Sequence, residues 1–429
     1  GPYPGMGKGD PDTYKAFAWR FVHLLREGGR LGVVLPRSAL AAAGSGAWRK
    51  QMLDTCAVRE IGLLQNTGGW VFADVHQQYT VGLVCLHKEA PGSEAVIPLH
   101  GPYNSLARFE AGVRREPVRL PLAVLRAASD TLSLPLLPSD ESADAWLQMR
   151  KAPRLDRDAR GEWRARPYAE FHATNDKPRM KFEQRDGLWP IYKGESFDLW
   201  NSDTGTYYAW GDPEKLVGHL QERRQGSYGD KNSPFTEFDR RWIEDDVSLP
   251  CLHPRIAFRD VSRATDSRTL RAALLPPKVF VTNKGPYFLW PRGDEMDQAY
   301  LLGILSSIPL DWYARRHVET NMNYFVINPF PIPRPARSEK SWQRVVAVAG
   351  RLAAQDTRFR PWAKKVGVEC GKLAAAERDD LIAELDALSA RLYGLSERQL
   401  VHIFETFHEG WDFSPRLSAV LKHFGRVGS

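Results

Sequence analysis

The order of helices and strands expected over residues 11–88 constrains the fold more than any other feature of this sequence. Residues 13–25 carry apolar side chains at helical spacing, and the apolar, valine-rich run at residues 30–36 follows directly. Residues 48–56 then favour a helix, and residues 58–64 and 80–87 favour strands. A short apolar strand between helices is typical of a parallel sheet covered on both faces. The pattern therefore predicts an α/β fold, the second half of a doubly wound sheet with residues 30–36 buried on both faces.

Composition changes along the chain predict four parts, which are residues 1–90, 91–150, 151–337 and 338–429. Residues 91–150 are rich in proline, leucine and small residues, which indicates a connector with one short strand at 95–99. Residues 151–337 combine aromatic and β-branched residues with turn pairs such as Lys193-Gly194 and Lys284-Gly285, which predicts a separate, irregular α+β domain. Residues 338–429 return to helical spacing, and Ser396 with Gln399 forms a capping-box pattern.

Length and cysteine usage exclude several classes of protein. With 429 residues and 43% hydrophobic content, the chain is long enough to bury two or three cores. It contains no run of roughly 18 apolar residues, and its first ten residues lack an apolar signal core, so we expect a cytoplasmic protein without a membrane partner. The four cysteines are far apart without CxxC spacing, which indicates neither a zinc site nor a disulfide framework.

The charge of the chain is compatible with a nucleic-acid partner but is spread along the sequence. The formal net charge is +7. Residues 251–292 depart from the even distribution, because they contain eight Lys or Arg and only two acids, Asp260 and Asp266. This segment is a local basic patch rather than a polybasic tail.

Four stretches, in a fixed order, support a resemblance to a known family. They are residues 7–40 (GKGDPDTYKAF to RSAL), 252–290 (LHPRIAFRD to YFLW), 301–335 (LLGILSSIP to IPRP) and 381–407 (LIAELDAL to FETF). These stretches resemble the amino-methyltransferases of type IIG restriction-modification systems and the related methylases of the BREX and DISARM phage-defence systems. The resemblance implies a Rossmann-like methyltransferase sheet, then a target-recognition domain and a helical tail, with double-stranded DNA as the partner.

The same resemblance implies a cofactor and its pocket. Family members methylate the amino group of adenine with S-adenosylmethionine, and the helix of the first stretch borders the cofactor pocket. Asp12, Tyr14 and Phe17 correspond to that helix and are the predicted cofactor-binding residues. The alternative interpretation is that Phe17, Phe21 and Leu24 form the buried stripe of an ordinary amphipathic helix.

Two motifs that such an enzyme needs are not found in the sequence. Family members hold the cofactor on a glycine-rich strand-to-helix turn, and they bind the target base with an [N/D/S]-P-P-[Y/F/W] loop. Gly5, Gly7 and Gly9 imitate the first motif, but no apolar strand precedes them. Residues 328–331 read NPFP, which we interpret as a structural exit from the recognition domain. We therefore expect a chain that is inactive alone and is completed by a missing catalytic half or by another chain of a defence complex.

The predicted DNA-contacting residues follow from the chemistry of arginine and lysine. A guanidinium group can pair with a phosphate or with the two acceptors of guanine, whereas lysine acts as a point charge. Arg263 and Arg268 lie in the predicted loop and should reach outward most freely, although an ordinary surface position or an ion pair with Asp260 or Asp266 is an equal alternative for each arginine. The complete set of predicted DNA-binding residues is Lys193, Arg255, Arg259, Arg263, Arg268 and Lys284.

An aromatic cluster in the same domain has two interpretations. Its rings could stack on a displaced base, but core packing of a small β domain is the better explanation. The cluster comprises Trp189, Tyr192, Phe197, Trp200, Tyr207, Tyr208 and Trp210.

Three functional hypotheses remain at this point. The leading one is the target-recognition portion of an S-adenosylmethionine-dependent adenine-N6 DNA methyltransferase. The second is a non-enzymatic DNA-binding or specificity subunit that recruits a separate catalytic chain. The third is an architectural protein whose helical tail docks a partner.

Overall fold

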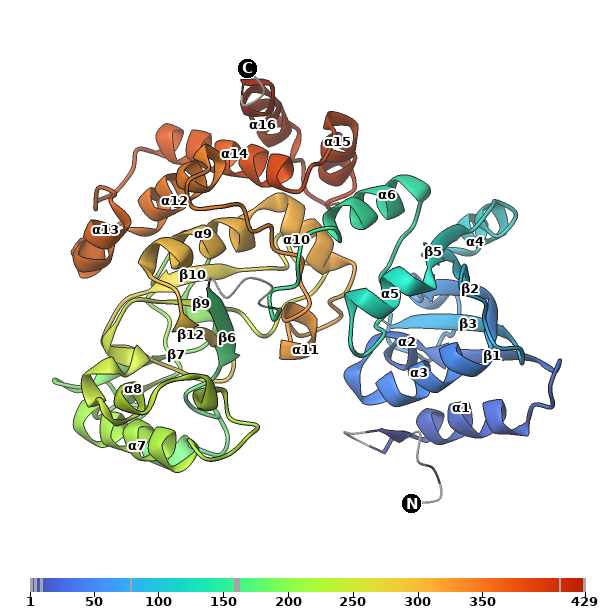
Figure 1. Ribbon diagram of the computed structural model, residues 1–429, viewed down its shortest axis with the longest axis horizontal. Coiled ribbons are helices and arrows are strands. Elements are labelled where there is room, and N and C mark those ends of the chain that lie inside the picture. The colour runs from blue at the N-terminus through green and yellow to red at the C-terminus, as the bar shows by residue number, and fades with distance from the viewer. Residues whose placement is uncertain are drawn as a thin grey trace. The chain divides into compact units, whose positions relative to one another are not determined.

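The computed structural model describes residues 3, 6–7, 11–77, 79–157, 163–408 and 410–426. The chain divides into two compact units, residues 1–150 and 151–429, which are called unit 1 and unit 2 below. The structure is a mixed α/β protein with several sheets and a helical C-terminal part (Figure 1). None of the described helices is long and apolar enough to cross a membrane.

Unit 1 is built on a five-stranded sheet with the order β1-β3-β2-β4-β5. Strand β3 runs antiparallel to both of its neighbours, β1 and β2, so β1 and β2 are parallel to each other on either side of it. Strand β4 is parallel to β2 and antiparallel to β5. The strands are β1 (Arg30–Pro36), β2 (Ala57–Gln65), β3 (Thr80–His87), β4 (Val96–Tyr103) and β5 (Val118–Pro121).

The helices of unit 1 bury small and apolar side chains. Helix α1 turns Ala18 and Val22 inward, and α3 buries Trp48, Met52 and Leu53 at 2% exposure or less. Complete burial of a side chain of this size contributes roughly 1.5–3 kcal/mol. The helices are α1 (Thr13–Leu24), α2 (Arg37–Ala41), α3 (Gly46–Thr55), α4 (Leu106–Gly112), α5 (Leu122–Ala128) and α6 (Asp140–Met149).

The predicted order of elements in residues 11–88 is confirmed, but the predicted environment of residues 30–36 is wrong. Strand β1 pairs antiparallel with β3 and lies at the edge of the sheet. Its side chains alternate between exposed and half-buried positions up to Val34, which is 55% exposed, and Leu35 is buried at 3% exposure. The apolar run therefore marks a strand at the edge of the sheet that the described residues form, not a strand buried on both faces.

Unit 2 contains two sheets that share a core. A four-stranded antiparallel sheet has the order β10-β9-β12-β6, and a three-stranded sheet has the order β11-β7-β8, in which β11 and β7 are parallel. Tyr192, Phe197 and Tyr287 are at most 1% exposed in the core between them, so core packing of the aromatic cluster is confirmed for its central members. The strands are β6 (Arg164–Tyr168), β7 (Trp189–Tyr192), β8 (Ala209–Gly211), β9 (Arg255–Phe258), β10 (Ala272–Leu275), β11 (Phe280–Val281) and β12 (Tyr287–Arg292).

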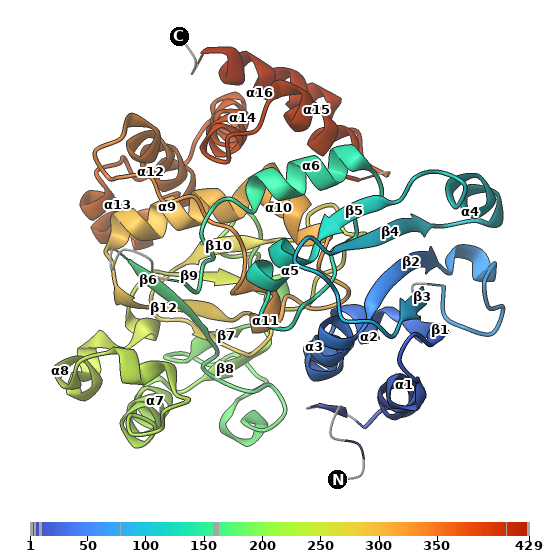
Figure 2. The ribbon, with the colours of Figure 1, turned by 45° about the vertical axis from the view of Figure 1, so that its right-hand side comes forward.

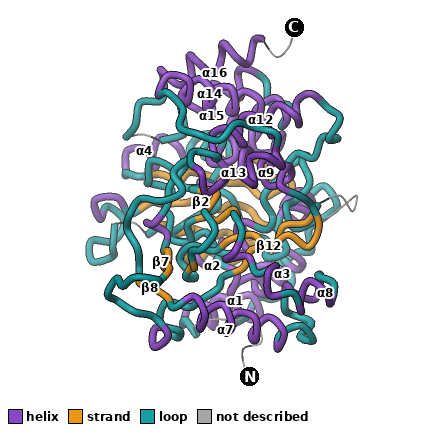
Figure 3. The backbone as a smooth tube through the Cα atoms, turned by 90° about the vertical axis from the view of Figure 1, so that its left-hand side faces the viewer, coloured by secondary structure: helices purple, strands orange, loops and turns teal. Residues whose placement is uncertain are grey.

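Helices cover unit 2 and complete its C-terminal part. Helix α9 is buried over nearly its whole length and contacts β9, β10 and α12. Figure 2 shows α7 and α8 side by side, and Figure 3 shows α12, α14, α15 and α16 gathered at the C-terminal end. The predicted capping box of Ser396 and Gln399 is confirmed at the start of α15.

The bounds of these helices are α7 (Pro213–Gly226), α8 (Arg240–Glu244), α9 (Glu295–Ser306), α10 (Ile308–Arg315), α11 (Tyr324–Ile327), α12 (Lys340–Ala353), α13 (Arg360–Val366), α14 (Ala375–Leu392), α15 (Glu397–Glu405) and α16 (Ser414–Arg426).

Candidate nucleic-acid interface

Three strand ends of unit 2 meet and bring predicted DNA-binding residues together. Lys193 follows β7 and Lys284 follows β11, and these strands are parallel, so both residues leave the sheet at the same edge. The backbone nitrogen of Asp260, just after β9, donates to the carbonyl of Lys284 at 3.2 Å. A Cβ atom at Gly194 would lie 2.9 Å from that same carbonyl, so the close approach of the two turns requires glycine here.

The lysines of this edge are partly neutralised by neighbouring carboxylates. Lys193 Nζ lies 2.6 Å from Glu195 Oε2, and its hydrogen bond lowers the pKa of that glutamate. Lys284 Nζ lies 2.9 Å from Asp260 Oδ2, which also accepts a hydrogen bond from Asn321 Nδ2 at 3.0 Å. The lysine side chains remain 32% and 44% exposed. Both ammonium groups are therefore accessible to a phosphate that competes with the carboxylate.

The loop after β9 holds Arg263 in an exposed position. The loop is tied to residues 320–322 by hydrogen bonds from Ser262 N to Thr320 O and from Met322 N to Asp260 O. The backbone nitrogen of Arg263 itself donates to Asp266 Oδ2 at 3.0 Å. Within the described ranges, no hydrogen bond or ion pair is made by its guanidinium group. Arg263 therefore has the outward position that the sequence predicted.

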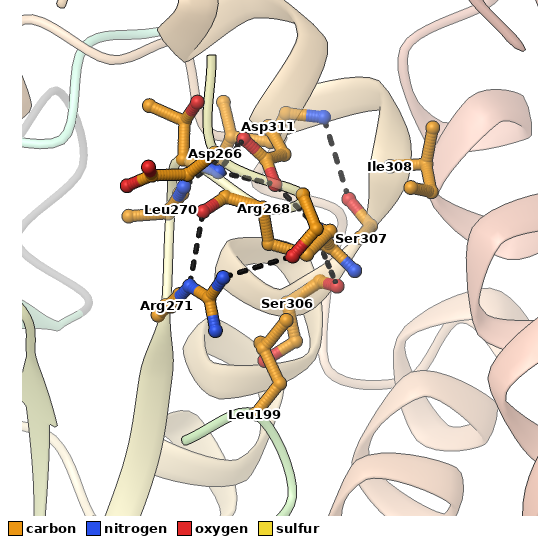
Figure 4. A network of polar contacts seen from close by, with 12 residues as sticks. Leu199, Asp266, Arg268, Leu270, Arg271, Ser306, Ser307, Ile308 and Asp311 are labelled. Atoms are coloured by element: carbon orange, nitrogen blue, oxygen red, sulfur yellow. Dashed lines mark hydrogen bonds and ion pairs between the residues drawn. The ribbon is translucent and has the colours of Figure 1, made fainter. Parts of the chain in front are cut away.

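Arg268 does not reach outward, and that prediction is wrong. Its side chain is 10% exposed, and Nε donates to Asp311 Oδ2 at 2.5 Å while Nη2 donates to the carbonyl of Ser306 at 2.7 Å. Asp311 is fully buried on α10 and also accepts from the backbone nitrogens of Thr269 and Leu270 (Figure 4). An unpaired carboxylate in that position would be strongly destabilising, so Arg268 is held as its counter-charge.

Arg255 is buried in the same way. Its side chain is 3% exposed and lies 3.1 Å from Glu170 Oε1, which is 2% exposed. Burial raises the pKa of Glu170, and the adjacent Arg255 opposes that rise. Arg259 lies closer to the surface, but it donates to the carbonyl of Phe197 and pairs with Asp198 at 3.2 Å. All these arginines therefore hold unit 2 together, and their partners differ from the predicted Asp260 and Asp266.

The predicted cofactor residues lie at the start of α1. Asp12 is the N-cap of the helix but makes no side-chain capping bond, and Tyr14 Oη lies 3.2 Å from Ser45 Oγ. The ring of Phe17 is 58% exposed and stacks on Phe21 at 5.9 Å. Leu24 is 64% exposed. The alternative interpretation as a buried stripe is therefore wrong for Phe17 and Leu24.

Two motif-like segments take structural positions. Phe330 is 1% exposed, and its carbonyl accepts from Leu155 N at 2.8 Å, which fits the interpretation of residues 328–331 as structural. Gly7 has a positive φ of 67° and packs against the carbonyl of Gly44. Gly5 and Gly9 lie outside the described residues. No group of three or more His, Cys, Asp or Glu that could hold a metal ion occurs in the described ranges.

Sequence reasoning missed two surface features. In unit 1, Asn66 is fully buried and organises the loop after β2 through four hydrogen bonds to the backbone of residues 71, 72 and 75. This loop leaves Phe72 and Tyr79 exposed at 44% and 62%. In unit 2, Phe182 is 55% exposed in a loop that contains several lysines and arginines. For Phe182 the sequence gives one signal, an aromatic residue inside a charged segment. The sequence does not show whether such a residue is exposed or belongs to the core, and only its burial in the structure decides this.

Comparisons with known proteins give limited similarity. No protein-family profile and no curated protein matches the chain. Solved structures that resemble it include the type IIL restriction-modification enzyme MmeI in complex with DNA (12% identity, TM-score 0.45, 91% of this chain and 51% of that chain), the type IIG restriction endonuclease BpuSI (12%, 0.32, 99% and 51%) and a DrdV–DNA complex (12%, 0.34, 82% and 40%). The chain thus spans about half the length of these proteins or less, and at these TM-scores the likeness establishes neither an activity nor a site.

Proposed function

We propose that this chain is the DNA target-recognition portion of an S-adenosylmethionine-dependent adenine-N6 DNA methyltransferase from a restriction-modification or phage-defence system. The observation that carries the proposal is the strand-end cluster of unit 2, where Lys193, Lys284 and Arg263 leave the sheet at loops tied to one another. Loops that a rigid scaffold holds in place are well suited to recognising a ligand. The ordered sequence segments that resemble the amino-methyltransferases indicate that this ligand is DNA.

Unit 1 supports the catalytic part of the proposal. Its β1 and β2 are parallel, so their carboxyl ends lie at one edge of the sheet, where ligands of α/β proteins bind. Among the described residues no strand pairs with the outer edge of β1, and the side chain of Val34 on this strand is exposed. An open strand edge of this kind is a template for a further strand. We propose that a Rossmann-like catalytic half, on the same polypeptide or on another chain, pairs along β1 and completes the doubly wound sheet.

The start of α1 offers suitable chemistry for the cofactor. The exposed ring of Phe17 presents a face for an adenine ring, and the uncapped carboxylate of Asp12 can accept hydrogen bonds from ribose hydroxyls. Tyr14 is already engaged with Ser45. S-adenosylmethionine would supply the methyl group. Because the side chains of Phe17 and Asp12 supply only part of the contacts that a cofactor needs, we expect the cofactor to bind the completed enzyme and not this chain alone.

The proposal is tested by measuring how the chain binds labelled duplex DNA over a salt series, with and without S-adenosylmethionine. We expect Arg263→Ala to weaken binding and to lower the salt slope by about 1, because one phosphate contact is lost. Arg360→Ala is the matched control, since Arg360 is also exposed but belongs to α13. Absence of DNA binding, or equal losses in both variants, would contradict a recognition role for the strand-end cluster.

A methyl-transfer assay separates the proposal from a non-enzymatic specificity subunit. That alternative is favoured by the two catalytic motifs that are not found in the sequence. Sequence-dependent binding is expected under both hypotheses, so the specificity subunit would be supported if the protein that completes unit 1 transfers no methyl group from labelled S-adenosylmethionine to DNA. Methyl transfer to adenine by the full-length protein, lost when Val34→Lys places a charge on the β1 edge, would support the methyltransferase proposal instead.

A further inference from the structure

The loop between β6 and β7 is anchored firmly at its centre. Met180 is 5% exposed and packs into the core that also contains Leu216 and Phe280. The next residue, Lys181, is bound to Trp210 of β8 by two backbone hydrogen bonds of 2.8 and 2.7 Å. A loop fixed in this way presents the following residue, Phe182, in a defined position.

Phe182 is directed to the surface despite this anchoring. Its side chain is 55% exposed, and its ring has an edge contact with Tyr208 at 6.0 Å between centroids. Tyr208 is itself held by a hydrogen bond to the carbonyl of Ala173 at 3.0 Å. An exposed aromatic ring on a fixed support offers a flat face on which another planar group can stack.

The charges around the ring are arranged unevenly. Lys177 Nζ lies 5.5 Å from the centre of the Phe182 ring, and Lys181 is the neighbouring residue. Two of the loop's acids have other partners, since Glu183 pairs with Arg185 at 3.1 Å and Asp176 accepts from the backbone nitrogen of residue 172 at 2.7 Å, while Asp186 is exposed four positions after Phe182. In the described part of the chain, neither Lys177 nor Lys181 pairs with a carboxylate. The ring is therefore flanked by two available cations.

We propose that Lys177, Lys181 and Phe182 form a base-stacking contact for DNA, in which the ring stacks on an unpaired base and the lysines bind the flanking phosphates. This inference rests on the proposed function, because it assumes that unit 2 binds DNA. A flat aromatic face beside cations suits nucleic acid, in which planar bases alternate with anionic phosphates. A purely apolar protein partner would leave the two lysines without counter-charges. The contact is separate from the strand-end cluster, since no residue is shared between them.

The proposal is tested with a duplex that carries one unpaired 2-aminopurine, whose fluorescence is quenched by stacking, and with the matching fully paired duplex. Phe182→Ala should weaken binding of the unpaired probe by about 5- to 150-fold, which corresponds to the ~1–3 kcal/mol of base–aromatic stacking. The variant should also abolish the protein-induced quenching and leave the salt slope unchanged. Phe182→Tyr should restore both properties, since it keeps a flat ring. Lys177→Ala and Lys181→Ala should each lower the salt slope by about 1.

Two controls make the outcomes distinct. Trp411→Ala removes an aromatic side chain of similar exposure, 59%, from the C-terminal part and should change nothing. Wild-type protein that binds DNA while Phe182→Ala retains full affinity and quenching would overturn the stacking contact and leave the proposed function intact. Equal weakening on both duplexes without a change in quenching would also overturn it. Wild-type protein that binds neither duplex would overturn the proposed function together with this inference.

Discussion

Replacing Arg268 with alanine should destabilise unit 2 rather than act on DNA directly. The change removes the guanidinium group that donates to Asp311 Oδ2 at 2.5 Å and to the carbonyl of Ser306 at 2.7 Å. It also removes a cation–π contact with Phe407, whose ring centre lies 5.9 Å from the guanidinium carbon. Asp311 is fully buried, so its carboxylate would be left without its closest counter-charge.

The size of the effect follows from what remains around Asp311. Breaking a buried ion pair by removing one partner costs about 3–5 kcal/mol. Here the backbone nitrogens of Thr269 and Leu270 still donate to the carboxylate at 3.1 and 3.0 Å, and Arg315 Nε lies 3.9 Å away. We therefore expect a loss at the lower end, about 3 kcal/mol, which is roughly a 100-fold change in the local opening equilibrium.

Hydrogen exchange measured by mass spectrometry on peptides that cover residues 260–275 provides the assay, with urea denaturation as the global measure. Arg263→Ala in the same loop is the control, because its side chain is exposed and its loss should leave exchange unchanged. Exchange in Arg268→Ala should accelerate by about two orders of magnitude. The reasoning would be refuted if Arg268→Ala exchanged at the wild-type rate and kept the wild-type urea midpoint but lost DNA affinity. That result would place Arg268 at the DNA interface.

Further predictions concern the other charged groups of unit 2. Arg263→Ala should change the free energy of unfolding by less than about 0.5 kcal/mol, measured by urea denaturation. Arg255→Met should destabilise the protein by about 3–5 kcal/mol at pH 7, because Glu170 loses its buried partner. Burial raises the pKa of Glu170. In Arg255→Met the buried negative charge of Glu170 therefore destabilises the folded protein at pH values above the folded-state pKa of Glu170. Protonation of Glu170 removes this charge. The difference in unfolding free energy between wild type and variant should therefore shrink when denaturation is repeated at lower pH. A deficit that grows toward acid pH would contradict this. Lys284→Ala should cost no more than about 1 kcal/mol of stability, since the pair with Asp260 is partly exposed, but it should weaken DNA binding at low salt.

The sequence predicted the elements of unit 1 better than their pairing. Apolar runs and helical spacing are local properties, so the order of helices and strands in residues 11–88 could be predicted. The position of β1 in the sheet could not be predicted. Strand β3, which begins more than 40 residues after the end of β1, lies between β1 and β2 and pairs with both. An apolar run of seven residues has the same sequence whether it is central or at an edge, and only the observed pairing distinguishes the two cases.

The predicted DNA-binding arginines show the same limit in unit 2. Sequence placed them on strands and their connecting loop, and in the structure Arg255 lies on β9, Arg259 directly follows it, and Arg263 and Arg268 lie in the loop before β10. Their ionic partners are distant in sequence, since Glu170 precedes Arg255 by 85 positions and Asp311 follows Arg268 by 43. A charge count along the sequence therefore identified a basic patch, although its buried arginines are neutralised by acids from outside it.

This neutralisation limits how unit 2 can bind DNA. Of the DNA-contacting residues proposed above, Arg263, Lys177 and Lys181 pair with no carboxylate in the described part of the chain, whereas Lys193 and Lys284 compete with Glu195 and Asp260. If each forms one phosphate contact, the slope of log K against log salt concentration is about −3 to −4.5. A steeper slope for a complex of this chain with the proposed catalytic half would mean that further phosphate contacts come from that half. Recognition by unit 2 would then depend more on the shape of its fixed loops and on Phe182 than on charge, because Arg255, Arg259 and Arg268 hold the fold together.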